Sequence, residues 1–221
     1  PRRTVLKPVR KPMNVAYLIP LLLLGAACSI QYFLGTKKNR WLGHRMSQQA
    51  ERLLNPKDTE YVTIGGAIGY HFKYKLRDPW TSAKGSYTFI PRHSLLYVPF
   101  TYLLGNRDRF VMNIFTDKKL ISEGHIIEKG HLKRAKIDGE WSMSKEEIVR
   151  DGKTFVLLWR QESILAPLKR TFETIPEPES LTHFCCFDDN KTFFLYLNPK
   201  KGEIENNLKH FLSVCPEYFK Q

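Results

Sequence analysis

The chain of 221 residues is long enough for one domain with a genuine hydrophobic core, and its formal net charge of +13 raises nucleic acid as a partner. The first 13 residues carry five positive charges, and residues 36–52 carry five against Glu51, so most of the excess charge flanks one apolar segment. A nucleic-acid-binding domain carries its basic surface on the folded part, so we expect no nucleic acid partner.

The apolar segment predicts a transmembrane helix over residues 14–35, preceded by a basic arm at 1–13. No charged residue lies between Lys11 and Lys37. The core of this stretch, Val15–Leu34, spans about 30 Å as a helix, which is the hydrocarbon thickness of a bilayer. A cleaved signal peptide has an apolar region of only about 7–15 residues. We therefore expect a membrane anchor in contact with membrane lipid, whose flanking positive charges suit anionic headgroups.

The orientation of this anchor does not follow from its flanks, because Lys and Arg are balanced on its two sides. The arm at 1–13 contains no acidic residue and is rich in Lys and Arg, as mitochondrial presequences are. The arm is therefore compatible with the remnant of such a presequence.

A helical connector is expected at 36–56. Leu42, Met46 and Ala50 recur at helical spacing with polar residues between them. The pair Asn55-Pro56 ends this helix, because the residue before a proline is pushed out of the helical region. The remaining residues, 57–221, form the soluble domain.

Strand signals dominate the soluble domain. Tyr70, Phe72, Tyr74 and Leu76 alternate with polar residues, and the glycines before them indicate a turn or bulge. Further strands are expected at Tyr87–Ile90, Leu95–Val98, Phe110–Phe115, His125–Glu128 and Leu132–Ile137.

Two hairpins and a helix follow. The first hairpin runs from Glu140 to Trp159 and turns at Asp151-Gly152, and the second pairs Leu181–Phe187 with Thr192–Leu197. The segment Ile164–Ser180 contains three prolines and is expected to be a surface connection. A helix at Glu203–Val214 closes the chain. The fold class is α+β: one N-terminal transmembrane helix, a helical connector, and a mainly antiparallel β-sheet domain with a C-terminal helix.

One stretch, Leu95 to Leu104, is almost entirely apolar and too short to span a membrane. A pair of buried strands is the expected structure. The alternative is an exposed patch that faces a partner or skims the membrane. Its residues are Leu95, Leu96, Tyr97, Phe100 and Tyr102.

No motif for catalysis or for a bound cofactor stands out. A nucleophile elbow, a phosphate-binding loop and a dinucleotide fingerprint are all missing, so we expect no catalytic residue and no cofactor. The seven histidines are scattered, and the four cysteines lack metal-ligand spacing, so no metal site is expected. Cys185 and Cys186 are adjacent and should point to opposite faces of a strand.

Within the anchor, Gly25 and Ser29 are four residues apart, which is the small-residue spacing that lets another helix approach closely, and Gln31 offers a polar contact. We expect these three residues to bind a partner helix.

The order of segments resembles the cytochrome-oxidase assembly factor one family and its relative, the mitochondrial presequence-translocase accessory subunit twenty-one. The similar parts are the uncharged span, the helix ending at Pro56, the Gly65–Ile68 element, Glu123-Gly124 before a strand, and the hairpin that starts near Trp141. An insertion around His93–Lys119 and a tail after Leu158 depart from the family pattern.

This resemblance implies a single-pass protein of the mitochondrial inner membrane with its soluble domain in the intermembrane space. It further implies a non-enzymatic accessory subunit or assembly factor that binds subunits of a respiratory or import complex, with no catalytic residues. An alternative is a secretory-pathway, membrane-anchored protein that binds a lipid or another ligand, for which the sequon Asn190-Lys191-Thr192 would matter. A membrane-anchored enzyme of an unrecognised type is a third hypothesis.

Overall fold

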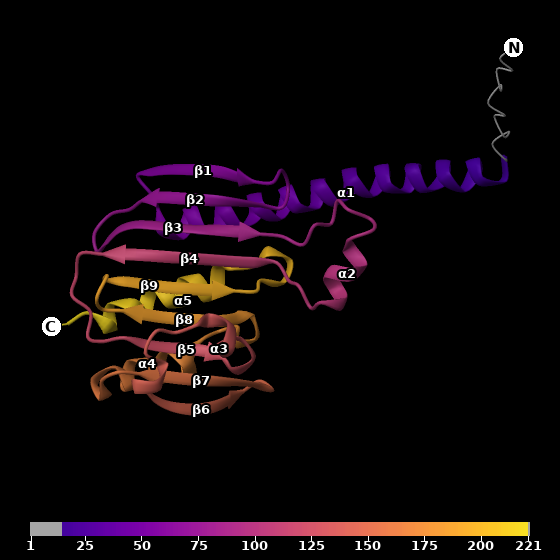
Figure 1. Cartoon of the computed structure of the whole chain (residues 1–221). Helices are drawn as coiled ribbons and strands as arrows, with labels where there is room; N and C mark the ends of the chain where they lie inside the picture. Colours follow the sequence, from indigo (N-terminus) through magenta and orange to yellow (C-terminus); the bar gives the residue numbers. More distant parts are fainter. Residues whose placement is uncertain (1–14, 221) are drawn as a thin grey trace, which may run out of the picture.

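The computed structural model of the chain describes residues 15–220, so the expected basic arm at 1–13 lies outside the described residues. One long helix, α1 (Val15–Leu54), leads into a sheet of nine strands (Figure 1). The strands are β1 (Asp58–Ile64), β2 (Gly69–Lys75), β3 (Trp80–Thr88), β4 (Arg109–Thr116), β5 (Gly124–Glu128), β6 (Ser144–Arg150), β7 (Lys153–Trp159), β8 (Leu181–Phe187) and β9 (Thr192–Leu197). The helices after α1 are α2 (Val98–Leu103), α3 (Lys129–Ala135), α4 (Leu165–Thr174) and α5 (Glu205–Val214).

The sheet is antiparallel throughout, with the strand order β1-β2-β3-β4-β9-β8-β5-β7-β6. The pairing of β4 with β9 joins the N-terminal strands to the C-terminal ones. The expected fold class, α+β with a mainly antiparallel sheet and a C-terminal helix, is therefore confirmed.

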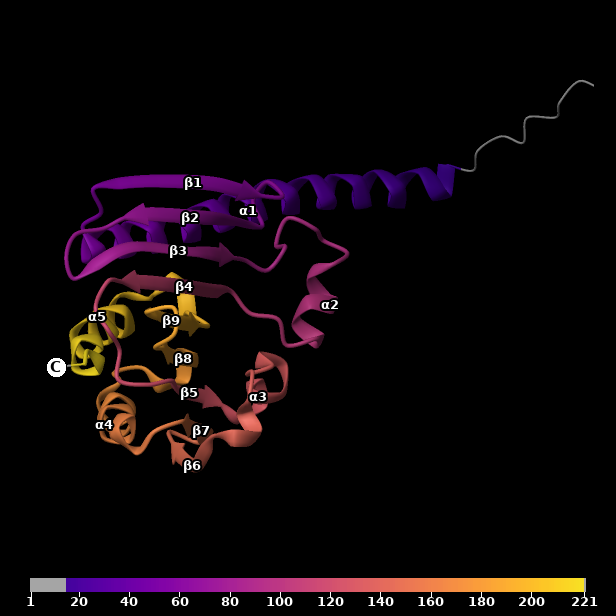
Figure 2. The same cartoon turned by 60° about the vertical axis from the view of Figure 1, so that its left-hand side comes forward.

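The main core lies on one face of the sheet, beneath the C-terminal half of α1 together with α4 and α5 (Figures 1 and 2). Phe110, Met112 and Ile114 of β4 point into it because they alternate along the strand. On the opposite face, α3 covers β5 and β7 over a small second cluster that includes Ile127 and Leu158.

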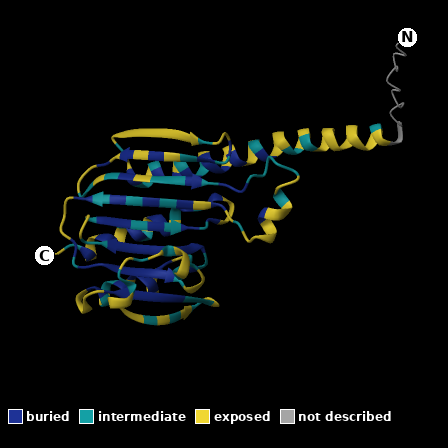
Figure 3. Ribbon diagram, in the orientation of Figure 1, coloured by how far each residue is buried: buried dark blue, intermediate teal, exposed yellow. Residues whose placement is uncertain are grey.

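The anchor and the connector form a single uninterrupted helix. The N-terminal half of α1 is almost entirely exposed, whereas Leu42, Met46 and Ala50 are buried against the sheet (Figure 3). An apolar helix from the core of a soluble protein would be buried, so the exposure of this half favours a membrane anchor. Among the described residues, α1 is the one helix long and apolar enough to cross a membrane.

Gln49 ties α1 to the end of the chain. Its side-chain oxygen accepts hydrogen bonds from the backbone N–H groups of Ile204 (2.8 Å) and Glu205 (2.9 Å), and its amide donates to the Gly202 carbonyl (2.8 Å). These two N–H groups start α5 and have no partner within that helix. The connector half of α1 is thus an integral part of the domain.

Both predicted hairpins are confirmed. Asp151 and Gly152 have φ of 50° and 75°, as the turn between β6 and β7 requires. The glycines before Tyr70 form the turn of a further hairpin, β1–β2.

Three predicted elements are wrong. The expected strand at Leu132–Ile137 is mostly the helix α3, and the expected strand at Leu95–Val98 is a turn that leads into α2. The expected surface connection at Ile164–Ser180 contains α4, whose Leu168 and Phe172 are buried in the core. In α4 the residue Pro167 sits in the first turn, where a helix tolerates proline.

Candidate functional site

The segment between β3 and β4 folds back against the anchor. The side-chain amide of Gln31 donates a hydrogen bond of 2.6 Å to the carbonyl of Arg92. At Gly35, an added Cβ would lie 2.2 Å from backbone atoms of Arg92, so only glycine allows this approach. The segment therefore contacts α1 where its uncharged stretch ends.

A polar network fixes the base of this segment. Asn39 on α1 is completely buried and donates to the carbonyls of Ala67 (3.0 Å) and Ile90 (2.9 Å). Arg92 donates to the Asn39 side-chain oxygen at 2.9 Å and to both carboxylate oxygens of Asp108, at 2.8 and 2.7 Å. The two ends of the segment and α1 are thus held in one arrangement.

The tip of the segment presents apolar side chains to the outside. Leu96, Tyr97, Phe100 and Tyr102 of the predicted patch are exposed, and Leu95 is half-buried. Leu103 and Leu104 extend the patch and are 83% and 72% exposed. The expected pair of buried strands is therefore wrong. These side chains are exposed, and that they face a partner or the membrane stays a prediction. We refer to the residues Leu95–Leu104 as the α2 patch.

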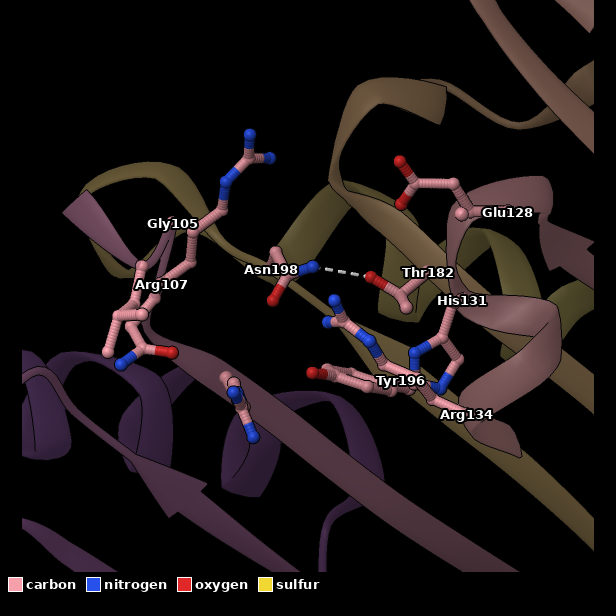
Figure 4. Close-up of a pocket in the computed structure, with 12 residues that line it drawn as sticks. Gly105, Arg107, Glu128, His131, Arg134, Thr182, Tyr196 and Asn198 are labelled. Atoms are coloured by element: carbon pink, nitrogen blue, oxygen red, sulfur yellow. Dashed lines mark hydrogen bonds between the residues drawn. The ribbon is translucent and has the colours of Figure 1, made fainter. Parts of the chain in front are cut away.

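A basic pocket lies directly beside the α2 patch. Its volume is about 210 Å³. It is lined by Leu104, Gly105, Asn106, Arg107, Arg109, Glu128, Gly130, His131, Arg134, Thr182, Tyr196 and Asn198. The chain segment that leaves α2 thus forms one wall, β4 and β9 form the floor, and α3 forms the other wall (Figure 4).

The pocket carries unpaired positive charge. Within residues 15–220, none of Arg107, Arg109 and Arg134 forms an ion pair, although these three guanidinium groups share one cavity. The one lining carboxylate, Glu128, lies 3.6 Å from the Lys153 ammonium. The pocket therefore has a strong excess of positive charge.

Neutral hydrogen-bonding groups complete the pocket. Burial, and then the charge of Arg134, lowers the pKa of His131, so this imidazole is neutral near pH 7. Its ring packs edge-on against Tyr196, with 5.2 Å between the ring centroids. Asn198 donates a hydrogen bond to the Thr182 hydroxyl (Figure 4).

This arrangement suits a small anion. Guanidinium groups bind phosphate and carboxylate through paired N–H donors. The volume is below the roughly 300–1,000 Å³ of pockets for drug-sized ligands, so a phosphoryl group fits better than a large organic molecule.

The α2 patch and the basic pocket lie at the same end of the molecule. Figures 1 and 2 both show α2 at the end of the sheet from which α1 departs, and Figure 2 shows α3 on the same side of the molecule as α2. An apolar surface and a pocket for anions therefore both face the region that a bilayer around the anchor would occupy.

The three residues of the anchor that are predicted to bind a partner helix differ in their surroundings. Gly25 has no neighbouring atom within 4 Å of an added Cβ, so its side of the helix is open. The Ser29 hydroxyl donates to the Gly25 carbonyl at 2.9 Å, within the helix. Gln31 instead contacts the chain's own segment at Arg92. Binding of a partner helix by these residues stays a prediction.

No motif in the sequence predicts the basic pocket. Its arginines come from the segment before β4, from β4 itself and from α3, and they meet only in the folded sheet. The alternation of Arg107 and Arg109 was the one local signal.

Comparison with protein-family models finds no match to this chain, and a search of curated proteins finds no significant match either.

Proposed function

We propose that this chain is a single-pass, membrane-anchored protein that binds the phosphoryl group of an anionic lipid headgroup in its basic pocket. One observation carries this proposal: the pocket and the α2 patch share Leu104, at the end of the sheet where α1 departs. As a binding protein, the chain needs no catalytic residues.

Depth in the bilayer supports the proposal. The contacts of Gln31 and Gly35 hold the α2 patch at the level where the uncharged stretch of α1 ends. A surface helix buries its apolar side chains about 5–10 Å into the boundary between headgroups and acyl chains. With the α2 patch at that depth, the pocket beside it lies among the headgroups.

The positive charge near the end of the anchor also supports the proposal of lipid binding. Attraction to anionic lipid contributes about 1 kcal/mol for each Lys or Arg near the membrane surface. The cationic residues that follow the anchor, among them Lys37, Lys38 and Arg40, add to the attraction without forming a pocket. The three pocket arginines would therefore add selectivity for a phosphate that is free to enter the cavity.

The test measures lipid retention by the full chain in mild detergent, using native mass spectrometry with phosphatidic acid, phosphatidylcholine and inorganic phosphate. The double variant Arg107→Gln/Arg134→Gln should bind phosphatidic acid at least tenfold more weakly. The control Lys73→Gln/Arg77→Gln removes the same charge at the opposite end of the sheet and should bind as the wild type does. Equal loss of lipid binding in both variants would show that net charge alone causes the effect, and would contradict binding in the pocket. If the protein binds inorganic phosphate but not phosphatidic acid, the ligand is a soluble phosphate and the lipid proposal is contradicted.

A second candidate function is that of an accessory subunit or assembly factor of a respiratory or import complex in the mitochondrial inner membrane, as the family resemblance implies. The open side of α1 at Gly25 favours it, because a partner helix can approach there. Replacing Gly25 and Ser29 by Leu should then reduce co-purification of partner subunits from native membranes. Unchanged recovery would remove this role of the anchor.

Asn190 offers a test of the membrane system. It is exposed in the turn between β8 and β9, so a glycosyltransferase could reach it. We infer that a domain in the intermembrane space carries no glycan there. A glycosidase-sensitive decrease in mass of the protein from its native cells would instead place the domain in the secretory lumen.

A further inference from the structure

A cluster of potential metal ligands lies on the sheet face opposite the main core, where the His183 ring is 6.3 Å from the His131 ring of the basic pocket. His125 on β5 pairs directly with Cys185 on the neighbouring strand β8. His183 is two residues before Cys185, so the alternation of β8 puts both on one face. Antiparallel pairing of β5 with β8 thus places His125 beside His183 and Cys185, which lie about 60 residues later in the chain (Figure 1).

The three side chains are buried and close together. His125 and Cys185 are completely buried, and His183 is 6% exposed. Nδ1 of His125 lies 3.1 Å from Nε2 of His183, and Nε2 of His125 lies 3.8 Å from Sγ of Cys185. One donor atom from each residue can be chosen so that all lie within 4.8 Å of one another.

These separations approach those of a coordination sphere. Zinc binds nitrogen at about 2.0–2.1 Å and thiolate sulfur at about 2.3 Å, which sets neighbouring donors about 3.3–3.6 Å apart in a tetrahedron. The 3.1 Å between Nδ1 of His125 and Nε2 of His183 already approaches this scale. Sγ of Cys185 lies 3.8 Å from the other nitrogen of His125, so its side chain has to rotate toward Nδ1 to join the same ion.

A carboxylate supports the cluster from outside. Oε1 of Glu123 lies 3.1 Å from Nε2 of His125, and Arg160 donates a hydrogen bond to the other oxygen of Glu123. In metal sites, a ligating histidine commonly donates its second N–H to such a carboxylate, which fixes the ring and its tautomer. Glu123 and Arg160 are placed for that role if His125 binds metal through Nδ1.

We propose that His125, His183 and Cys185 bind one borderline-soft divalent metal ion, with Zn²⁺ as the first candidate and Glu123 as the outer partner of His125. Two imidazoles and a thiolate are the donor set that selects zinc over magnesium or calcium. A cavity of about 250 Å³ adjoins Glu123, which lines it together with Arg160 and Asp188.

The simpler interpretation is a buried relay of hydrogen bonds from Glu123 through His125 to His183, which satisfies these polar groups without a metal. The thiol separates the two interpretations. The relay from Glu123 to His183 persists without the Cys185 thiol, whereas the proposed metal site requires its sulfur. Cys186, which points into the main core, provides a matched control on the next residue of the same strand.

The experiment uses the full chain in mild detergent, purified through a histidine-free tag, stripped with a chelator and titrated with Co²⁺ and Zn²⁺. The wild type should bind one ion per chain, and the cobalt form should show the charge-transfer band of a bond between thiolate and cobalt. Cys185→Ala should abolish this band, whereas Cys186→Ala should keep it. His183→Ala should weaken binding about 100-fold or more, and Glu123→Gln about 10–100-fold with the band retained.

Folding of each variant is checked by near-ultraviolet circular dichroism. If a variant does not fold, the titration of the wild type by itself tests whether the protein binds the metal. A folded wild-type protein that shows no stoichiometric cobalt band, or a band lost equally in Cys186→Ala, would overturn the proposal. Zn²⁺ should displace bound Co²⁺ and remove the band, because zinc prefers a tetrahedral site of this kind.

Discussion

Gln31 and Arg92 are joined by a hydrogen bond of 2.6 Å that links the anchor to the segment carrying α2. A glutamine in the apolar part of a transmembrane helix is costly unless its amide has a partner. Here the partner belongs to the same chain. The position of the α2 patch relative to the bilayer therefore follows from contacts within one molecule.

Gly35→Ala should displace the segment from α1. The new methyl group would meet backbone atoms of Arg92 at 2.2 Å, which cannot move aside as a flexible side chain could. Overpacking of this kind costs about 1–3 kcal/mol. Hydrogen exchange of the amides around Arg92 should become faster. Gly25→Ala on the same helix meets open space, and the same exchange rates should be unchanged in it.

Asp108→Asn should destabilise the domain. Asp108 accepts hydrogen bonds from two nitrogens of Arg92 and from the backbone of Ile90, and its side chain is 8% exposed. Leaving a largely buried guanidinium without its counter-charge costs roughly 3–5 kcal/mol. Thermal unfolding followed by circular dichroism should show a clear decrease in Tm.

Asp58→Asn serves as the comparison for that prediction. Its ion pair with Lys75 is largely exposed, so the free energy of unfolding should change by less than about 0.5 kcal/mol. Similar decreases in Tm for the two variants would contradict a structural role of the Arg92–Asp108 pair.

Leu103 should lie in the bilayer. A cysteine at this position, labelled with a polarity-sensitive fluorophore, is expected to emit at shorter wavelength and to be quenched by lipids brominated in their acyl chains. The control is Val149→Cys on the edge strand β6, which is 69% exposed, similar to the 83% of Leu103. Equal quenching at the two positions would mean that the α2 patch does not enter the membrane.

The protein should lose stability as the pH falls from 7.5 to 5.5, partly through His210. Burial lowers the pKa of His210, although its hydrogen bond to the Thr171 carbonyl opposes the shift. The unfolded imidazole protonates at a higher pH, near 6.5, so the unfolded state binds more protons as the solution becomes acidic. Stability from this residue is complete above the unfolded pKa and is lost below it.

His210→Gln should therefore flatten the dependence of unfolding free energy on pH in this window. Denaturant titrations of the wild type and the variant at a series of pH values measure the two slopes. Identical slopes would show that His210 does not contribute.

Much of the sheet follows from local patterns in the sequence. The turn at Asp151-Gly152 and the alternation of Phe110, Met112 and Ile114 each depend on neighbouring residues alone. The prediction that Cys185 and Cys186 face opposite sides of a strand is confirmed for the same reason, because Cys186 lies in the core and Cys185 faces the histidines.

Two of the three errors in secondary structure share one physical cause. Pro99 and Pro167 favour a break in regular structure when the sequence is considered alone. Each instead occupies the first turn of a helix, where its missing N–H has no partner to lose. The candidate sites escaped prediction for a different reason. Arg109 meets Arg134, and His125 meets Cys185, only through strand pairing over long separations.

The pairing of β4 with β9 has a consequence for synthesis of the chain. Residues 109–116 leave the ribosome well before residues 192–197, and at about 5–20 residues per second the delay is roughly 4–15 s. During this time one edge of β4 is unpaired, and the apolar residues of α1 that pack against α5 are still exposed. Since an open, apolar strand edge readily associates with other chains, the nascent protein should need protection by a chaperone until its last residues emerge.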